Sequence, residues 1–144
     1  MIAVDTNVLL RHLLGDDPSQ AARVHQLFAG TTKILLTDIV LVETIWTLKG
    51  KRYKALKEDI VAVISTLLEE PNIVFESQQA VWSALNDFMI ASPVKTAGGV
   101  RHIDFPDALI VHKARIVMQH FGVANEGVFT FDQAAQQLDS TRVP

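Results

Sequence analysis

Short apolar segments separated by longer helical stretches constrain the fold of this chain more than any other feature of its sequence. The apolar segments are IAV (2–4), KILL (33–36), IVF (73–75) and VFTF (128–131). The stretches between them carry apolar residues at helical spacing, as in 55–70. Strands joined through helices need crossover connections, which produce a mainly parallel sheet with helices on its faces. The sequence therefore predicts an α/β fold.

Cap and stop residues delimit the expected helices. Thr37 or Asp38 can cap the third helix and Gly50 can end it, while Gly30 suits the position after the second helix. The Gly-Gly segment 92–103 is expected to be a loop, and a short final helix is expected after the last strand. The helices are expected over 6–14, 19–30, 37–50, 55–70, 78–91 and 106–122.

Length and composition indicate one globular domain over residues 1–144. Hydrophobic residues make up 49% of the chain and charged residues 20%, which is typical of a folded protein. The chain has no cysteine, which excludes disulfides, zinc–thiolate and iron–sulfur clusters, and cysteine nucleophiles. We find neither a signal peptide nor an apolar stretch of membrane-spanning length, so a cytoplasmic protein without membrane contact is expected.

Two carboxylates follow expected strands directly. Asp5 comes after the first strand and Asp132 after the fourth. In open parallel sheets, ligands bind beyond the carboxyl ends of the strands. If these two strands are neighbours in the sheet, the two carboxylates meet at one edge.

Glu43 lies in a largely apolar helix. Between Ile39 and Leu48 the only other polar residues are Thr44 and Thr47. A single glutamate more often faces solvent or pairs with a lysine. The apolar density around Glu43 leaves little solvent-facing side, however, and a glutamate on an apolar face needs a partner or a metal ion.

Asp104 and Asp107 flank Pro106 at the start of the last long helix. Taken alone, such a pair is more often a helix cap than a catalytic site. Asp107 shares a stripe with Ile110 and Val117, which we expect to face the core. We therefore assign Asp107 as a ligand and Asp104 as a cap or auxiliary acid.

Four acids, Asp5, Glu43, Asp107 and Asp132, thus occupy strand ends or expected inward helix faces. Like charges share a site only when a cation neutralises them, and oxygen ligands favour Mg²⁺ first and Mn²⁺ second. The five histidines show no zinc-binding spacing. We expect His112 and His120 on the surface or flank of their helix.

Basic residues cluster in one segment of an otherwise acidic chain, whose net charge is -3. KGKRYKALK (49–57) carries five cations around Tyr53. Composition alone favours a solvated connection, and the alternative is a nucleic-acid contact.

MIAVDTNVLLR (1–11), TDIVLVETIWTL (37–48), DFPDALI (104–110) and TFD (130–132) together resemble PIN-domain nucleases in order and spacing, and VapC-type toxins of toxin–antitoxin pairs in particular. The resemblance implies a PIN-like three-layer sandwich whose mainly parallel sheet has four or five strands. It also implies an endoribonuclease dependent on Mg²⁺ or Mn²⁺. Its acidic site would consist of Asp5, Glu43, Asp107 and Asp132, with Asp104 nearby.

The same resemblance suggests supporting residues and partners. Thr6 and Asn7 would orient Asp5, and Thr130 precedes the last acid. An RNA substrate, an antitoxin protein and a homodimer are implied. The loop before Asp104 departs from the family pattern by adding Arg101 and His102. The residues assigned to RNA binding are Lys49, Lys51, Arg52, Tyr53, Lys54 and Arg101.

Three other functions were weighed. A haloacid-dehalogenase-type phosphatase needs a second acid where Asn7 stands, and a phospho-receiver domain needs an aspartate where IVFES offers only Glu76. A catalytically silent protein-binding domain on the same fold would not need the acids. The alternatives to the ribonuclease are therefore a phosphohydrolase that acts on another phosphate ester and a catalytically silent protein-binding domain.

Overall fold

The computed structural model describes all residues, 1–144, and its internal contacts divide the chain into two compact units, Met1–Gln78 and Gln79–Pro144. Each unit is described by itself. The mixed α/β class with a parallel sheet and helices is confirmed. The expectation of a single domain stays a prediction. None of the helices is both long and apolar enough to cross a membrane.

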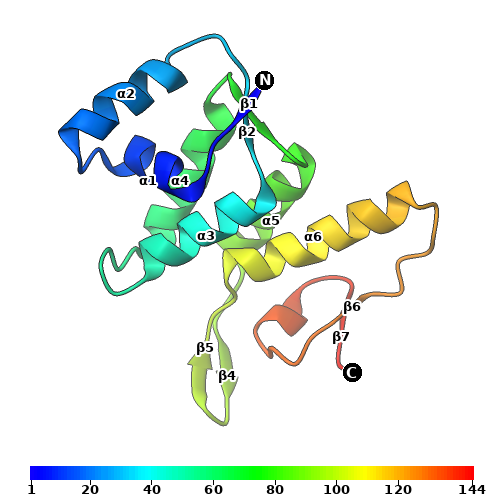
Figure 1. Cartoon of the computed structure of the whole chain (residues 1–144). Helices are drawn as coiled ribbons and strands as arrows, with labels where there is room; N and C mark the ends of the chain where they lie inside the picture. Colours follow the sequence, from blue (N-terminus) through cyan, green and yellow to red (C-terminus); the bar gives the residue numbers. More distant parts are fainter. The chain divides into compact units, whose positions relative to one another are not determined.

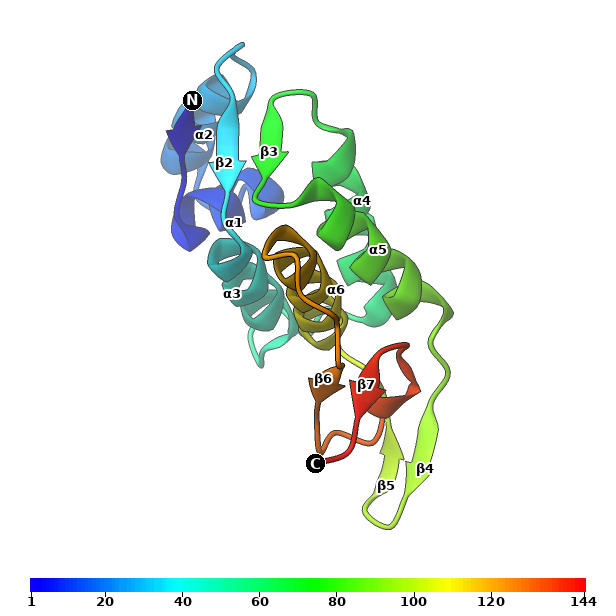
Figure 2. The same cartoon turned by 90° about the vertical axis from the view of Figure 1, so that its right-hand side faces the viewer.

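The first unit is built on a three-stranded parallel sheet in the order β1-β2-β3. Figure 2 shows the strands side by side, all pointing the same way. Ile34 at the centre pairs with Ile2 on one side and with Ile73 on the other. The strands are β1 (Ile2–Ala3), β2 (Ile34–Leu36) and β3 (Ile73–Phe75).

Crossover helices connect these strands, as the alternating sequence pattern requires (Figure 1). The helix α3 begins after the cap Thr37 and ends at Gly50, as expected. The end of α2 differs from the expectation, because Gly30 lacks a positive φ and Ala29 forms the cap in right-handed conformation. The helices are α1 (Thr6–Leu14), α2 (Pro18–Phe28), α3 (Asp38–Lys49) and α4 (Lys57–Glu69).

One face of α3 is buried and the other is open. Leu41, Thr44, Ile45 and Leu48 are buried, at the i, i+3, i+4, i+7 spacing of a helix face. Ile39 is 71% exposed and Trp46 is 59% exposed. The expectation that the apolar sequence leaves α3 little solvent-facing side is therefore wrong, since the exposed side of the helix also carries large apolar residues.

The second unit contains two helices, two small sheets and a short 3-10 turn. The segment 92–103, expected to be a loop, instead forms an antiparallel hairpin that Figure 1 shows as a narrow arm. Its strands are short and its turn is glycine-rich, so the period-2 signal is weak. The elements are α5 (Gln78–Ile90), β4 (Val94–Thr96), β5 (Gly99–Arg101), α6 (Phe105–His120), β6 (Val128–Phe129), η1 (Ala135–Gln137) and β7 (Thr141–Arg142).

The expected fourth strand forms, but it pairs with β7 in a separate two-stranded sheet. Val128 and Phe129 of β6 pair in parallel with Thr141 and Arg142 of β7. The parallel sheet therefore has three strands where four or five were expected. The segment after β6 contains the 3-10 turn η1 and brings β7 alongside β6 in parallel, so β7 provides the hydrogen-bonding edge that β6 uses.

The buried face of α6 differs from the stripe that the sequence suggested. Ile110 is 57% exposed and Val117 is 39% exposed. The buried positions are Phe105, Ala108, Leu109, Val111 and His112, with Pro106. The expected surface position of His112 is wrong as well.

His112 is buried because it has polar partners on both ring nitrogens. Its Nε2 lies 2.6 Å from Oδ2 of Asp87 on α5, and its Nδ1 lies 3.0 Å from the guanidinium of Arg115. Arginine can only donate, so Nδ1 accepts and Nε2–H donates to Asp87. This pairing fixes α5 to α6 and satisfies a polar side chain inside the core.

Candidate functional site

Asp5 lies just beyond the carboxyl end of β1 and forms the N-cap of α1. Its Oδ1 accepts a hydrogen bond from the backbone N–H of Val8 at 2.9 Å. The side chain is exposed, and Oδ2 accepts no hydrogen bond within the chain. The helix N-terminus stabilises this carboxylate through its dipole. Asp5 therefore has a structural partner on one oxygen and an open second oxygen.

Thr6 joins Glu43 to the same helix end. The Thr6 hydroxyl donates to Oε2 of Glu43 at 2.6 Å, a contact between positions 37 residues apart. Glu43 is exposed on α3, on the side that carries Ile39 and Trp46. The expectation that Glu43 points inward is therefore corrected, since it faces outward beside the N-terminus of α1. The Thr6 contact places Glu43 beside the N-terminus of α1, which Asp5 caps.

Asn7 makes a different contribution from the one expected. It is exposed and lines a hollow of about 390 Å³ between α1 and α2, together with Arg11 and Arg23. No hydrogen bond joins its side chain to Asp5, whose carboxylate accepts from the N–H of Val8 instead. Of the two residues expected to support Asp5, only Thr6 takes part in the local network of acids.

Asp104 and Asp107 form a reciprocal cap at the start of α6. Oδ1 of Asp104 accepts the N–H of Phe105 at 2.9 Å, and Oδ2 of Asp107 accepts the N–H of Asp104 at 3.1 Å. Both side chains are half-buried. The capping role expected of Asp104 is confirmed, and Asp107 shares it. These contacts hold two carboxylates at one helix N-terminus.

Asp132 sits in a tight turn after β6. Its N–H donates to the Thr130 hydroxyl at 3.0 Å, and its Oδ1 accepts the N–H of Ala135 at 2.9 Å. Thr130 therefore shapes the turn that positions Asp132, while the Asp132 side chain itself is exposed. This arrangement places the acid three residues beyond the strand rather than directly after it.

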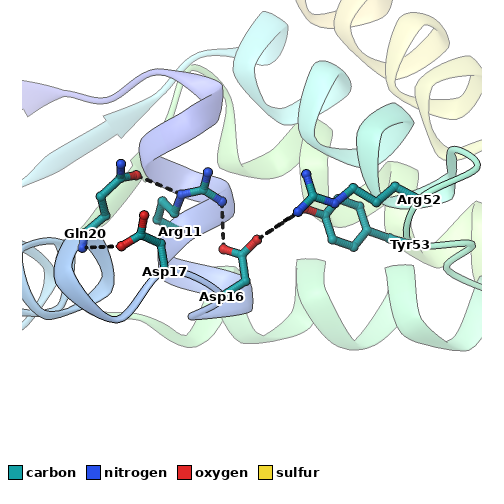
Figure 3. Close-up of polar contacts among 6 residues, drawn as sticks. All are labelled: Arg11, Asp16, Asp17, Gln20, Arg52 and Tyr53. Carbon is teal, nitrogen blue, oxygen red and sulfur yellow. Dashed lines mark hydrogen bonds and ion pairs between the residues drawn. The ribbon is translucent and has the colours of Figure 1, made fainter.

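The basic segment after α3 is tied to the loop between α1 and α2 (Figure 3). Asp16 accepts the guanidinium of Arg11 at 2.7 Å, and it lies 3.7 Å from Arg52 and 3.4 Å from the Tyr53 hydroxyl. The Arg52 guanidinium also lies 5.1 Å from the centre of the Tyr53 ring. These contacts engage the hydroxyl and one ring face of Tyr53. Arg52 therefore occupies a ring face on which a nucleobase would have to stack.

The acids form local groups rather than one described cluster. Asp5 and Glu43 belong to the first unit, and Asp104, Asp107 and Asp132 belong to the second. Within neither unit do three histidine, cysteine or acidic side chains gather in an arrangement that could hold a metal ion. The donor chemistry nevertheless suits Mg²⁺ or Mn²⁺, because every candidate ligand is a carboxylate oxygen.

Residues 2–140 match the PIN domain family. The chain therefore belongs to the PIN domain family, and the match runs through both compact units. PIN domains are generally nucleases, and they commonly use divalent metal ions. Comparisons with curated proteins and with solved structures gave no match.

One exposed aromatic residue was missed by the sequence analysis. Phe131 stands between Thr130 and Asp132 and is 79% exposed. An apolar residue inside an expected strand is normally assigned to the core, which is why its position drew no attention. Its two neighbours in the sequence, Thr130 and Asp132, are candidate site residues, and this position between them indicates that Phe131 lies near the site.

Proposed function

We propose that this protein is a metal-dependent endoribonuclease and the VapC-type toxin of a toxin–antitoxin pair. The observation that carries the proposal is the Thr6 hydrogen bond, which holds Glu43 beside Asp5 at the carboxyl end of β1 in a PIN-domain chain. That end of a parallel sheet is where ligands bind. Membership of a family of nucleases supports the reaction class.

In this proposal Asp5, Glu43, Asp107 and Asp132 hold Mg²⁺ or Mn²⁺, and Asp104 is an auxiliary acid. Oδ2 of Asp5 accepts no hydrogen bond and can serve as a ligand, while Oδ1 keeps its cap to Val8. When bound, such an ion makes a water molecule deprotonate near neutral pH and polarises the scissile phosphate.

The chain itself supplies orientation and charge balance. Thr6 holds Oε2 of Glu43, which leaves the other carboxylate oxygen to point elsewhere. Asp107 is fixed by the N–H of Asp104. Both pairs lie at helix N-termini, whose partial positive charge offsets part of the repulsion between carboxylates. Each pair of acids is therefore partly stabilised within its own unit before any cation binds.

The proposal includes a cytoplasmic location, an antitoxin partner and a homodimer. Large apolar side chains on the open face of α3, Ile39 and Trp46, support a protein interface in the first unit. In the second unit, Trp82, Met89 and Ile90 of α5 are exposed in the same way. A partner surface over either face would remove these side chains from water.

The test is cleavage of total RNA by the purified chain in Mg²⁺, in Mn²⁺ and in EDTA, alongside Asp5→Asn. Asp17→Asn is the matched control, because Asp17 caps α2 through the N–H of Gln20 just as Asp5 caps α1. Discrete fragments that require metal, vanish in Asp5→Asn and persist in Asp17→Asn are expected.

Cleavage by Asp5→Asn at the wild-type rate would overturn the site assignment. The absence of any metal-dependent cleavage, in a preparation whose mass spectrum shows no second protein, would favour the binding domain instead. Release of phosphate from a small ester without RNA cleavage would favour the phosphohydrolase.

A further inference from the structure

The second unit carries a hollow of about 310 Å³ that the proposed reaction does not use. It lies between the β4–β5 hairpin and the turn after β6, as its lining residues show. One of the candidate acids, Asp132, is part of its wall. The lining residues are Thr96, Ala97, Gly98, Arg101, Phe131, Asp132 and Gln133.

The hairpin side of the hollow is held by its turn. Thr96 pairs with Gly99 across the strands, and the Thr96 hydroxyl donates to the Gly99 carbonyl at 2.7 Å. Gly99 has a φ of +109°, a backbone angle that residues other than glycine rarely adopt. The arm therefore presents its side chains from a defined turn rather than from a free loop.

Strand alternation places Arg101 on the hollow side of the arm. Successive side chains of a strand point to opposite faces. The register pairs Arg101 with Val94 and Lys95 with Val100, so Arg101 shares a face with Thr96, while Lys95 lies on the other face. The Arg101 guanidinium lies beside the turn, 3.5 Å from where a Cβ on Gly98 would stand. Arg101 is exposed and has no acidic partner within ion-pair distance.

Phe131 forms the opposite wall. The turn that carries it is fixed by the hydrogen bonds of its two neighbours, Thr130 and Asp132. An aromatic ring that is 79% exposed on an ordered turn leaves its apolar face in water, without the gain that burial would give. A cation and an open ring therefore face one small hollow next to a candidate catalytic acid.

We propose that Phe131 and Arg101 form a clamp for one nucleotide of single-stranded RNA beside Asp132. The inference rests on the proposed function and specifies how its substrate is held. The base stacks on Phe131, and the guanidinium of Arg101 contacts the backbone phosphate. Stacking on a protein ring requires a base that is not already stacked in a duplex, so the clamp selects unpaired RNA. Arg101 also offsets the repulsion that Asp132 exerts on phosphate.

The test is the affinity of a short labelled single-stranded RNA, measured by fluorescence anisotropy in Mg²⁺ with the Asp5→Asn chain, so that cleavage does not interfere. Phe131→Ala is expected to weaken binding by at least about fivefold, the lower end for loss of one base stack. Arg101→Gln is expected to weaken binding and to lower the salt dependence of log Kd by about one phosphate contact. A double-stranded RNA of the same sequence should bind more weakly and be insensitive to Phe131→Ala.

Two control variants match these changes outside the hollow. Phe129→Ala removes another exposed ring, which is 59% exposed on β6, and Lys95→Gln removes a cation from the opposite face of the arm. Both should bind single-stranded RNA within about twofold of the parent chain, since neither side chain lines the hollow. Phe131→Trp should retain binding, because a ring is kept.

Equal affinity of Phe131→Ala, Arg101→Gln and the parent chain would overturn the clamp, even if the hollow then proved to bind a protein. Metal-dependent cleavage by the otherwise unchanged chain would leave the proposed function standing in that case. If the Asp5→Asn chain does not bind RNA and the otherwise unchanged chain does not cleave it, the clamp and the ribonuclease proposal fail together.

Discussion

The hydroxyl of Thr6 donates a 2.6 Å hydrogen bond to Oε2 of Glu43, and this contact links the first turn of α1 to the middle of α3. It is shorter than most neutral hydroxyl contacts, as expected when the acceptor is a carboxylate. Because Glu43 is exposed, the hydrogen bond has more effect on where the carboxylate points than on stability. A change at Thr6 should therefore separate orientation from folding.

Thr6→Val keeps the shape of the side chain and removes the donor. We expect it to lower the rate of RNA cleavage by about ten- to a hundredfold through misplacement of Glu43. The free energy of unfolding should fall by only about 0.5–1.5 kcal/mol. Thr6→Ser keeps the hydroxyl and should cleave at close to the wild-type rate. Equal rates for the valine and serine variants would show that the hydrogen bond does not serve the reaction.

Asp5 can be tested in two ways because it is both a cap and a candidate ligand. Asparagine caps a helix as well as aspartate does, whereas alanine costs about 0.5–2 kcal/mol. Asp5→Asn should therefore lose cleavage and keep, or slightly raise, the melting temperature in EDTA, since it removes a negative charge beside Glu43. Asp5→Ala should lose both cleavage and stability. Calorimetry of the two variants in EDTA checks the difference.

Thr44 is a buried residue whose hydroxyl has no hydrogen-bond partner. An unpaired buried polar group opposes folding, and valine has nearly the same shape. Thr44→Val should raise the free energy of unfolding by about 1 kcal/mol. Thr44→Ser keeps the hydroxyl, removes a methyl group and should be destabilised. Urea denaturation of the two variants measures both effects, and a valine variant less stable than the native chain would contradict the assignment.

The Asp87–His112 pair should behave as a coupled unit. His112 is buried and donates to Asp87 at 2.6 Å, so removing either partner leaves the other unsatisfied. A double-mutant cycle with Asp87→Ala and His112→Ala should give a coupling energy of about 1–2 kcal/mol in urea denaturation. Asp87→Ala combined with His120→Ala provides the control, because His120 is exposed at the end of the same helix and should be additive. Additivity in both cycles would mean that the pair adds nothing to stability.

The strands and helices of the first unit were predictable because local signals agree there. Short apolar runs alternate with amphipathic stretches, and Thr37 and Gly50 mark the ends of α3 where the structure has them. The position of Asp5 beyond the end of β1 could be anticipated from the strand pattern, whereas an association of Asp5 with Glu43 was implied by the family resemblance alone. The hydrogen bond from Thr6 to Glu43 could not be anticipated, because it joins positions 37 residues apart.

The face that each apolar helix buries was harder to predict. Ile110 and Val117 are exposed and His112 is buried, although periodicity favoured the opposite. A helix with apolar residues on several sides has no unique stripe, so the choice depends on its tertiary neighbours. In α6 the deciding neighbour is Asp87, which lies 25 residues away in the sequence. Its hydrogen bond to His112 satisfies the imidazole and so allows His112 to be buried.

The hairpin arm and the strand β7 were missed because their signals are short. Three-residue strands around a glycine turn offer too few positions for alternation to stand out from a loop. The strand β6 was correctly expected. Its partner β7 has only two residues, too few to show the alternation of apolar and polar residues that marks a strand.

The cap made by Asp5 has a consequence for how such a chain can change over generations. Aspartate and asparagine codons differ at a single base, and either side chain satisfies the Val8 N–H. One substitution in the gene could thus silence the proposed nuclease while the protein continues to fold and to bind its partners. A lineage carrying that substitution would inherit an inactive chain that still folds and competes with the active one for any shared partner.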